Sequence, residues 1–119
     1  MKKLIILLVG IILLCGCNKE EEISIKKVNC DEMKELLDDD AILIDVRAQS
    51  EYDVYHLDNA INIEYTSIDK KIESVVDSKD KKIIVYCQSG KRSDIAAQTL
   101  KDLGYKNIYD LGSINNCKK

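Results

Sequence analysis

The chain has 119 residues, 33% of them charged and 45% hydrophobic, with a net charge of −3. This length suits one domain and is too short for two. The mild acidity argues against a nucleic-acid partner, which would favour a basic face, and the sole histidine, His56, argues against a histidine-based metal site.

A short cationic start and an apolar run open the chain. Met1-Lys2-Lys3 precede the apolar residues 4–14, which as a helix would reach only about 16 Å at about 1.5 Å per residue. Because the hydrocarbon core of a membrane is about 30 Å thick, the run indicates a signal peptide and not a membrane span.

The segment Leu14-Cys15-Gly16-Cys17 follows that run and resembles the bacterial lipobox. The resemblance implies a signal peptide over residues 1–16, lipidation of Cys17 and a polar tether over residues 17–24. The protein would then be exported and lipid-anchored to a bacterial membrane, on the cell surface or the periplasmic side. The alternative is an ordinary secretory signal with incidental cysteines. Removal of residues 1–16 leaves 16 basic and 21 acidic residues, a net charge of −5.

Strands and helices are predicted to alternate over the first part of the domain. The expected elements are a strand at 25–28, a helix to Leu37 capped by Asn29 or Asp31, a strand at 41–46, a short helix at 48–55, a brief apolar stretch at 60–63 and a helix at 67–76. The strand at 41–46 is apolar apart from Asp45 near its end. Such a run suits a strand buried on both faces, as in a parallel sheet covered by helices.

The second part continues the alternation. A buried strand is expected at 83–86, ending at Cys87, and a last strand at 107–111. Between them, residues 92–103 predict the clearest helix, with Gly104 at its C-terminal cap. Its predicted apolar face consists of Ile95, Ala96, Thr99, Leu100 and Leu103. The alternation predicts an α/β fold with a mainly parallel central sheet flanked by helices.

The loop over residues 87–93, C-Q-S-G-K-R-S, carries the candidate chemistry. In open α/β sheets, ligand sites form at the carboxyl ends of the strands, where Cys87 is expected. Gly90 permits a tight turn, and the loop amides with the dipole of the following helix would form a nest for an anion. The same positive potential would favour a Cys87 thiolate at the mouth of the loop, so no histidine base is required.

Two cations and a serine complete the loop. Lys91 and Arg92 could hold an anionic donor, or they could face solvent at the start of the helix. Ser93 is expected to act as a local cap or packing residue. Taken alone, Cys87 could also be a buried and inert cysteine.

Three motifs in the chain resemble those of the rhodanese family. The loop matches the C-x-x-G-x-R-S pattern, and L-I-D-V-R at 43–47, E-Y at 51–52 and H-L-D-N-A-I-N-I at 56–63 match a second segment. The third match is G-Y-K-N-I-Y-D-L-G at 104–112. All three occur in the family's order, and the resemblance implies a single rhodanese-like domain over residues 25–119.

The resemblance also implies an activity. Cys87 would be the catalytic residue of a thiosulfate sulfurtransferase, which moves a sulfane sulfur from thiosulfate or a persulfide donor to a thiol or cyanide through a Cys87 persulfide. Substrate binding would fall to Gln88, Ser89, Gly90, Lys91 and Arg92. The partners would be a small anionic sulfur donor and a thiol acceptor, and neither a metal nor an organic cofactor would be needed.

Other residues are assigned to the scaffold by the same resemblance. Asp45, Arg47 and Glu51 would form a charge-assisted network that positions the segment facing the loop, and His56 would be structural. Tyr55 and Asn59 stand where the family has glycines, and Gln88 where it often has a basic residue. Asparagine can enter left-handed backbone conformations, which makes Asn59 a mild change; the sequence offers no explanation for Tyr55.

The cysteine count leaves a question open. After export, Cys30, Cys87 and Cys117 would remain beside the lipidated Cys17. An odd number in an oxidising compartment leaves at least one free or intermolecularly paired thiol, and Cys87 is the candidate for the free one. Cys117 could form a disulfide with Cys30, act on Cys87 as a resolving thiol, or remain a free tail cysteine.

Three other functions compete with sulfur transfer. A phosphatase or arsenate reductase needs a C-x5-R loop, whereas Arg92 falls at C-x4-R. A non-enzymatic persulfide carrier or sensor at the membrane would share Cys87 but show negligible turnover. A thiol-disulfide partner would use Cys117 or Cys30, although no C-x-x-C pair supports it.

Overall fold

The computed structural model describes residues 22–117, and within this range no helix is both long and apolar enough to cross a membrane. The predicted signal peptide over residues 1–16 and the lipidation site Cys17 lie outside the described residues. So does most of the tether predicted over residues 17–24. These assignments stay predictions.

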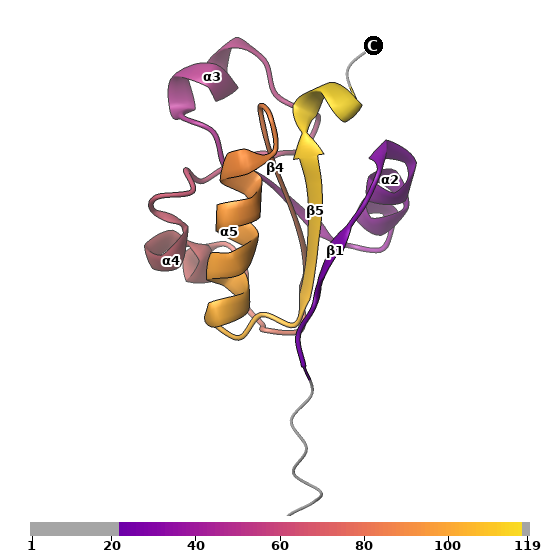
Figure 1. Ribbon diagram of the computed structural model, residues 1–119, viewed down its shortest axis with the longest axis vertical. Coiled ribbons are helices and arrows are strands. Elements are labelled where there is room, and N and C mark those ends of the chain that lie inside the picture. The colour runs from indigo at the N-terminus through magenta and orange to yellow at the C-terminus, as the bar shows by residue number, and fades with distance from the viewer. Residues whose placement is uncertain (1–21, 118–119) are drawn as a thin grey trace, which may run out of the picture.

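Five parallel strands form one sheet in the order β1-β5-β4-β2-β3 (Figure 1). The strands are β1 (Ile25–Lys27), β2 (Ile42–Asp45), β3 (Ile61–Asn62), β4 (Lys82–Cys87) and β5 (Asn107–Ser113). The central strand β4 is buried from Ile83 to Cys87, as expected for an apolar strand covered on both faces. The predicted α/β fold with a parallel sheet is confirmed.

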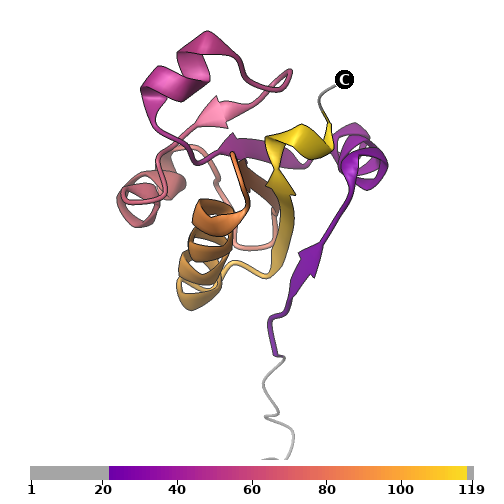
Figure 2. The same cartoon turned by 45° about the horizontal axis from the view of Figure 1, so that its top comes forward.

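Helices cover both faces of this sheet (Figures 1 and 2). They are α2 (Cys30–Asp38), α3 (Gln49–Val54), α4 (Ile68–Lys71), η1 (Ile72–Ser74), α5 (Lys91–Asp102) and η2 (Ile114–Asn116). The helices α4 and α5 pack on one face, and α2 and η2 pack on the other. The short helices α3 and η2 lie near the carboxyl ends of β4 and β5 (Figure 1).

The side chains of β4 alternate between two hydrophobic cores. Ile83, Val85 and Cys87 belong to the core beneath α5, whereas Ile84 and Tyr86 belong to the core beneath α2. This alternation is the period of two that a β-strand imposes. It places the Cys87 thiol on the α5 side of the sheet.

The helix predicted over residues 67–76 divides into two segments. The α-helix α4 ends at Lys71, and the 3₁₀ helix η1 continues from Ile72 to Ser74. The amide of Val75 donates to the carbonyl of Ile72 three residues earlier, which is the tighter 3₁₀ pattern. Ile68, Ile72 and Val76 are all buried, so both segments turn the same face inward.

The predicted apolar face of α5 is wrong in part. Ile95 is 47% exposed and Leu103 is 37% exposed, and the buried residues of the helix are Ser93, Ala96, Ala97 and Leu100. Ser93 lies against the end of β4, where its amide donates to the Cys87 sulfur. Residues three and four positions further along share that face, so the buried stripe runs through the two alanines.

Backbone conformations explain the two substituted glycine positions. Asn59 has φ of +70°, which confirms that this position lies in the left-handed region that asparagine tolerates. Tyr55 has φ of −165°, an extended conformation that any residue adopts, so no glycine is required there. Gly104, after the end of α5, has φ of +95°, as expected for a glycine at a helix C-terminus.

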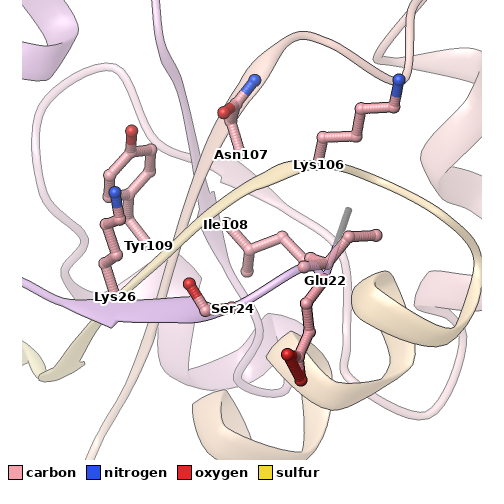
Figure 3. A pocket seen from close by; sticks show the side chains of 8 residues that line it. Glu22, Ser24, Lys26, Lys106, Asn107, Ile108 and Tyr109 are labelled. Atoms are coloured by element: carbon pink, nitrogen blue, oxygen red, sulfur yellow. The ribbon is translucent and has the colours of Figure 1, made fainter. Parts of the chain in front are cut away.

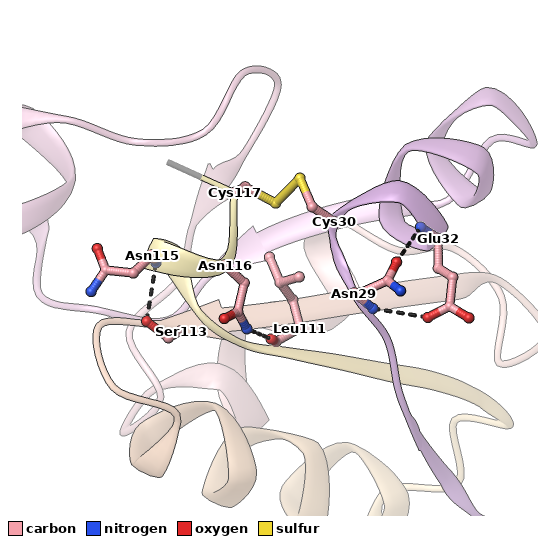
Figure 4. Close-up of a disulfide and its surroundings, with 8 residues drawn as sticks. All are labelled: Asn29, Cys30, Glu32, Leu111, Ser113, Asn115, Asn116 and Cys117. Atoms are coloured by element: carbon pink, nitrogen blue, oxygen red, sulfur yellow. Dashed lines mark hydrogen bonds between the residues drawn. A yellow bond between two sulfur atoms is a disulfide. The ribbon is translucent and has the colours of Figure 1, made fainter. Parts of the chain in front are cut away.

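A disulfide joins Cys30, at the start of α2, to Cys117, after η2 (Figure 4). The two Cα atoms are 5.3 Å apart, within the usual range, and 87 positions separate the cysteines in the chain. Both pack against the core beneath α2, on the opposite side of the sheet from Cys87. The structure therefore selects the Cys30 pairing among the three fates of Cys117, and Cys87 is the free cysteine of residues 22–117.

Side-chain caps hold both ends of this link in place (Figure 4). Asn29 caps α2: its side-chain oxygen accepts from the amide of Glu32, and the Glu32 carboxylate accepts from the amide of Asn29. The side chain of Asn116 donates to the carbonyl of Leu111 at 2.8 Å, which ties η2 to β5. The prediction that Asn29 or Asp31 caps this helix is settled in favour of Asn29.

Candidate active site

The Cys87 sulfur accepts two backbone hydrogen bonds from the loop that follows β4. The amide of Gly90 lies 3.0 Å from Sγ, and the amide of Ser93 lies 3.3 Å from it. Ser93 is in the first turn of α5, where amides have no partner within the helix. Two amides and the positive end of a 12-residue helix therefore point at one sulfur atom, an arrangement that stabilises negative charge on it.

The thiol lies deeper than the sequence predicted. Cys87 is 0% exposed and belongs to the core beneath α5, whereas we expected its sulfur at the mouth of the loop. The difference arises because Cys87 is the last residue of the buried strand β4, so its side chain follows the inward alternation of that strand. Any ligand that reaches Sγ must displace the atoms that cover it.

The shape of the loop depends on Gly90. Its φ of +106° lies in the region that disfavours side chains, and it directly precedes α5. The hydroxyl of Ser93 donates to the Gly90 carbonyl at 3.1 Å, which agrees with a local capping role for Ser93. On the other side of the loop, the hydroxyl of Ser113 donates to the Gln88 carbonyl at 2.7 Å.

A register shift between β4 and β5 brings Ser113 to this position. Val85 pairs with Asp110, but Tyr86 pairs with Gly112, so Leu111 is an extra residue in β5. Cys87 is consequently paired with Ser113. The sequence did not point to Ser113, although a residue at the end of a strand adjacent to β4 is a reasonable place to search.

Arg47 connects three parts of the site from a buried position. Its Nε and Nη2 donate to the Asp45 carboxylate at 2.7 to 3.1 Å, and its Nη2 also donates to the Tyr55 carbonyl at 2.6 Å. Its Nη1 donates to Oε1 of Gln88 at 3.3 Å. Burying this guanidinium requires such a complete set of partners, because an unpaired buried charge is costly.

Asn62 supports the same segment and was not identified from the sequence as a site residue. Its side-chain amide donates to the carbonyls of Asp45 and Arg47, each at 3.0 Å. It thereby holds the backbone on both sides of Val46. The sequence did contain a signal for this residue, because Asn62 lies in the motif over residues 56–63. Only the folded chain shows which groups Asn62 contacts.

Arg92 is paired with Glu51 of α3. Nη1 and Nη2 of Arg92 donate to the two carboxylate oxygens at 2.7 and 3.1 Å, a bidentate ion pair. The hydrogen bond from Arg92 lowers the pKa of Glu51 to about 2, although burial opposes the change; the Ala48 amide, 3.1 Å from Oε1, acts in the same direction as Arg92. Glu51 raises the pKa of Arg92 in return. The pair links α3 to the start of α5.

The remaining predicted residues have different surroundings. Ser89 and Lys91 are exposed. His56 stacks on Tyr52 with ring centroids 3.7 Å apart, and its Nδ1 donates to the Tyr52 carbonyl at 2.9 Å. Substrate binding by Gln88, Ser89, Gly90, Lys91 and Arg92 stays a prediction.

A separate groove of about 500 Å³ lies away from Cys87 and its loop. Figure 3 shows the side chains that line it. It is lined by Glu22, Ile23, Ser24, Lys26, Lys106, Asn107, Ile108 and Tyr109. The last three begin strand β5, whereas Cys87 pairs with Ser113 at the other end of that strand. The groove contains neither a cysteine nor a histidine.

Within residues 22–117, fold and site together define an α/β protein whose free cysteine, Cys87, is held by the amides of a strand-loop-helix connection. The family model described as the rhodanese-like domain matches residues 29–119. The chain belongs to this rhodanese-like family, which confirms the resemblance inferred from its motifs.

Curated proteins resemble part of this chain. A tRNA uridine(34) hydroxylase of Erwinia tasmaniensis is 36% identical over 85 residues, covering 67% of this chain and 24% of that protein. The chain thus spans about a quarter of the length of the curated relatives it matches.

Two solved structures match over most of their own length. A rhodanese with anions from E. coli is 30% identical, with a TM-score of 0.62 over 64% of this chain and 89% of that one. A rhodanese-related protein from Thermoplasma volcanium is 28% identical, with a TM-score of 0.63 over 75% of this chain and 86% of that one.

Proposed function

We propose that this protein is a sulfurtransferase of the thiosulfate sulfurtransferase type. It would move a sulfane sulfur from thiosulfate or a persulfide donor to a thiol or cyanide through a persulfide on Cys87. The observation that carries the proposal is the pair of amides, from Gly90 and Ser93, directed at the Cys87 sulfur. These donors would stabilise both the attacking thiolate and the negative charge of the persulfide.

The reaction consists of two displacements at sulfur. In the first, the Cys87 thiolate attacks the outer sulfur of thiosulfate; a new sulfur-sulfur bond forms, the bond within thiosulfate breaks and sulfite leaves with the electron pair. In the second, an acceptor thiolate or cyanide attacks the outer sulfur of the persulfide. The Cys87 thiolate is regenerated, and no electron or proton is required from another source.

The competing functions have less support. The C-x4-R spacing is one residue shorter than a phosphate-enclosing C-x5-R loop, and the Arg92 guanidinium is engaged by Glu51. A thiol-disulfide role would need a second thiol near Cys87, but Cys117 is bonded to Cys30 on the other side of the sheet. The hydroxylase name of the curated relatives is not transferred, because the chain spans 24% of the first of them.

Mass spectrometry of the purified protein after treatment with thiosulfate tests the proposal. We expect the Cys87 peptide to gain the mass of one sulfur atom, and cyanide to remove it. The absence of this adduct on Cys87 after treatment with thiosulfate and, in a parallel reaction, with cysteine persulfide would refute sulfur transfer. An adduct that forms but is never passed to cyanide or to a thiol would instead show a non-enzymatic persulfide carrier.

We also propose that the domain is held at the outer side of a bacterial membrane by a lipid on Cys17. The lipobox resemblance supports this, and so does the Cys30–Cys117 disulfide, since disulfides persist mainly in oxidising compartments.

In a bacterial host we expect the full chain in the membrane fraction and a Cys17→Ser variant released from it. A Cys15→Ser variant, which keeps a small residue before Gly16, should stay in the membrane fraction. Membrane retention of Cys17→Ser would contradict the anchor.

A further inference from the structure

Both arginines that reach the Cys87 loop are already neutralised by carboxylates. Arg47 forms a close ion pair with Asp45, and Arg92 forms a bidentate pair with Glu51. Both carboxylates come from one short segment, residues 45–51, which runs beside the loop. The guanidinium groups therefore offer the loop little net positive charge.

The other sources of positive potential are weaker. Lys91 is exposed, so solvent and salt screen its charge. The start of α5 contributes the equivalent of only about half an elementary charge. Position 88, directly after the nucleophile, is the neutral Gln88, and its side-chain oxygen faces Arg47. The site is thus equipped to stabilise a single negative charge on sulfur and poorly equipped to hold a dianion.

From this charge balance we infer that Glu51 determines donor specificity: by neutralising Arg92, it disfavours dianionic thiosulfate and favours an organic persulfide with one negative charge at its reacting sulfur. The inference rests on the proposed function and narrows its donor class. Glu51 acts through Arg92 and is not itself in contact with the Cys87 sulfur in any hydrogen bond of the described residues. It is therefore a specificity residue and not a catalytic one.

The chain allows a clean test at this position. Oε1 of Glu51 also accepts the amide of Ala48 at 3.1 Å, which closes the first turn of α3. Glutamine can accept the same hydrogen bond through its one oxygen, so Glu51→Gln keeps this cap. It removes the charge opposite Arg92, and with it the second oxygen that accepts from Nη2. Glu51→Asp keeps the charge and shortens the side chain.

Glu32 provides a matched control. It occupies the equivalent capping position of α2, where its carboxylate accepts the Asn29 amide at 2.9 Å, but it has no arginine partner. Glu32→Gln therefore changes the net charge by the same amount and leaves the charge around the Cys87 loop as it is. Its donor preference should match that of the wild-type protein.

The readout is the second-order rate constant for loading sulfur onto Cys87, measured by rapid quenching and mass spectrometry. The two donors are thiosulfate and cysteine persulfide generated in the assay. In Glu51→Gln we expect the ratio of the thiosulfate constant to the persulfide constant to rise at least about threefold, and the thiosulfate constant to fall more steeply with salt. Glu51→Asp should stay close to the wild-type ratio.

An unchanged or lower ratio in a folded Glu51→Gln protein would overturn the inference. If that variant does not fold, the wild-type protein still tests the inference. We expect its rate constant for thiosulfate to change little with ionic strength. A steep fall of this constant with salt would show an uncompensated cation at the site and would also overturn the inference. Failure of the proposed function is a different result, since the wild-type Cys87 would then take sulfur from neither donor.

Discussion

Replacing Cys87 with serine is expected to reduce sulfur transfer from thiosulfate to cyanide by at least about a thousandfold, to the background rate. Serine is close in size to cysteine, and its oxygen can accept from the same two amides, those of Gly90 and Ser93. The loop should therefore keep its shape, while the hydroxyl cannot carry the transferred sulfur. The measurement is the initial rate of thiocyanate formation, with circular dichroism to show that the variant is folded.

A Cys117→Ser variant is the control for this experiment. Cys117 lies on the other side of the sheet from the Cys87 thiol and is bonded to Cys30. We expect this variant to retain turnover at temperatures well below its unfolding midpoint. Turnover that survives in Cys87→Ser would show a different nucleophile, and turnover lost in folded Cys117→Ser would assign the disulfide a part in the reaction.

Removing the Cys30–Cys117 disulfide is expected to lower the free energy of unfolding by about 2–5 kcal/mol. The bond joins residues 87 positions apart, so its loss releases a long segment of the unfolded chain. In the native state it fastens η2 to α2, beside the end of β5 (Figure 4). Urea denaturation of the wild-type protein and of a double Cys30→Ser, Cys117→Ser variant measures the difference.

Reduction supplies an independent check on the same bond. A reductant should lower the midpoint of the wild-type protein toward that of the double variant and leave the double variant unchanged. Equal midpoints for the oxidised and reduced wild-type protein would contradict the prediction. Such a result would mean that packing of η2 against the core beneath α2, and not the covalent link, holds the C-terminus in place.

Much of the fold followed from patterns within short stretches of the sequence. The apolar run at 83–86 and the nearly apolar run at 41–46 both become buried parallel strands. The glycine at 104 marks the end of the longest helix, and Asn29 marks the start of the first described one. These predictions succeeded because hydrogen bonding and side-chain direction repeat every two residues in a strand and every three or four in a helix, so a local pattern contains the information.

The amide geometry around Cys87 could also be predicted from the sequence. A cysteine that ends a buried strand, followed by Gly90 and the start of a helix, predicts amides around a sulfur atom, and the structure places the amides of Gly90 and Ser93 there. Neighbouring residues of one loop are enough to specify this geometry. The burial of the sulfur could not be predicted in this way, because burial depends on which residues from the rest of the chain cover it.

The tertiary structure alone decided which distant groups meet. Cys30 and Cys117 are 87 positions apart, and Arg92 and Glu51 are 41 positions apart, yet each pair is in direct contact. The rotation of α5 leaves Ile95 exposed and buries Ser93 beside Cys87, and the helix's own apolar pattern did not predict it. Such pairings depend on how whole elements pack. By itself the sequence determined the parallel sheet and the loop with its cysteine, whereas packing decided the charge balance and the covalent link around them.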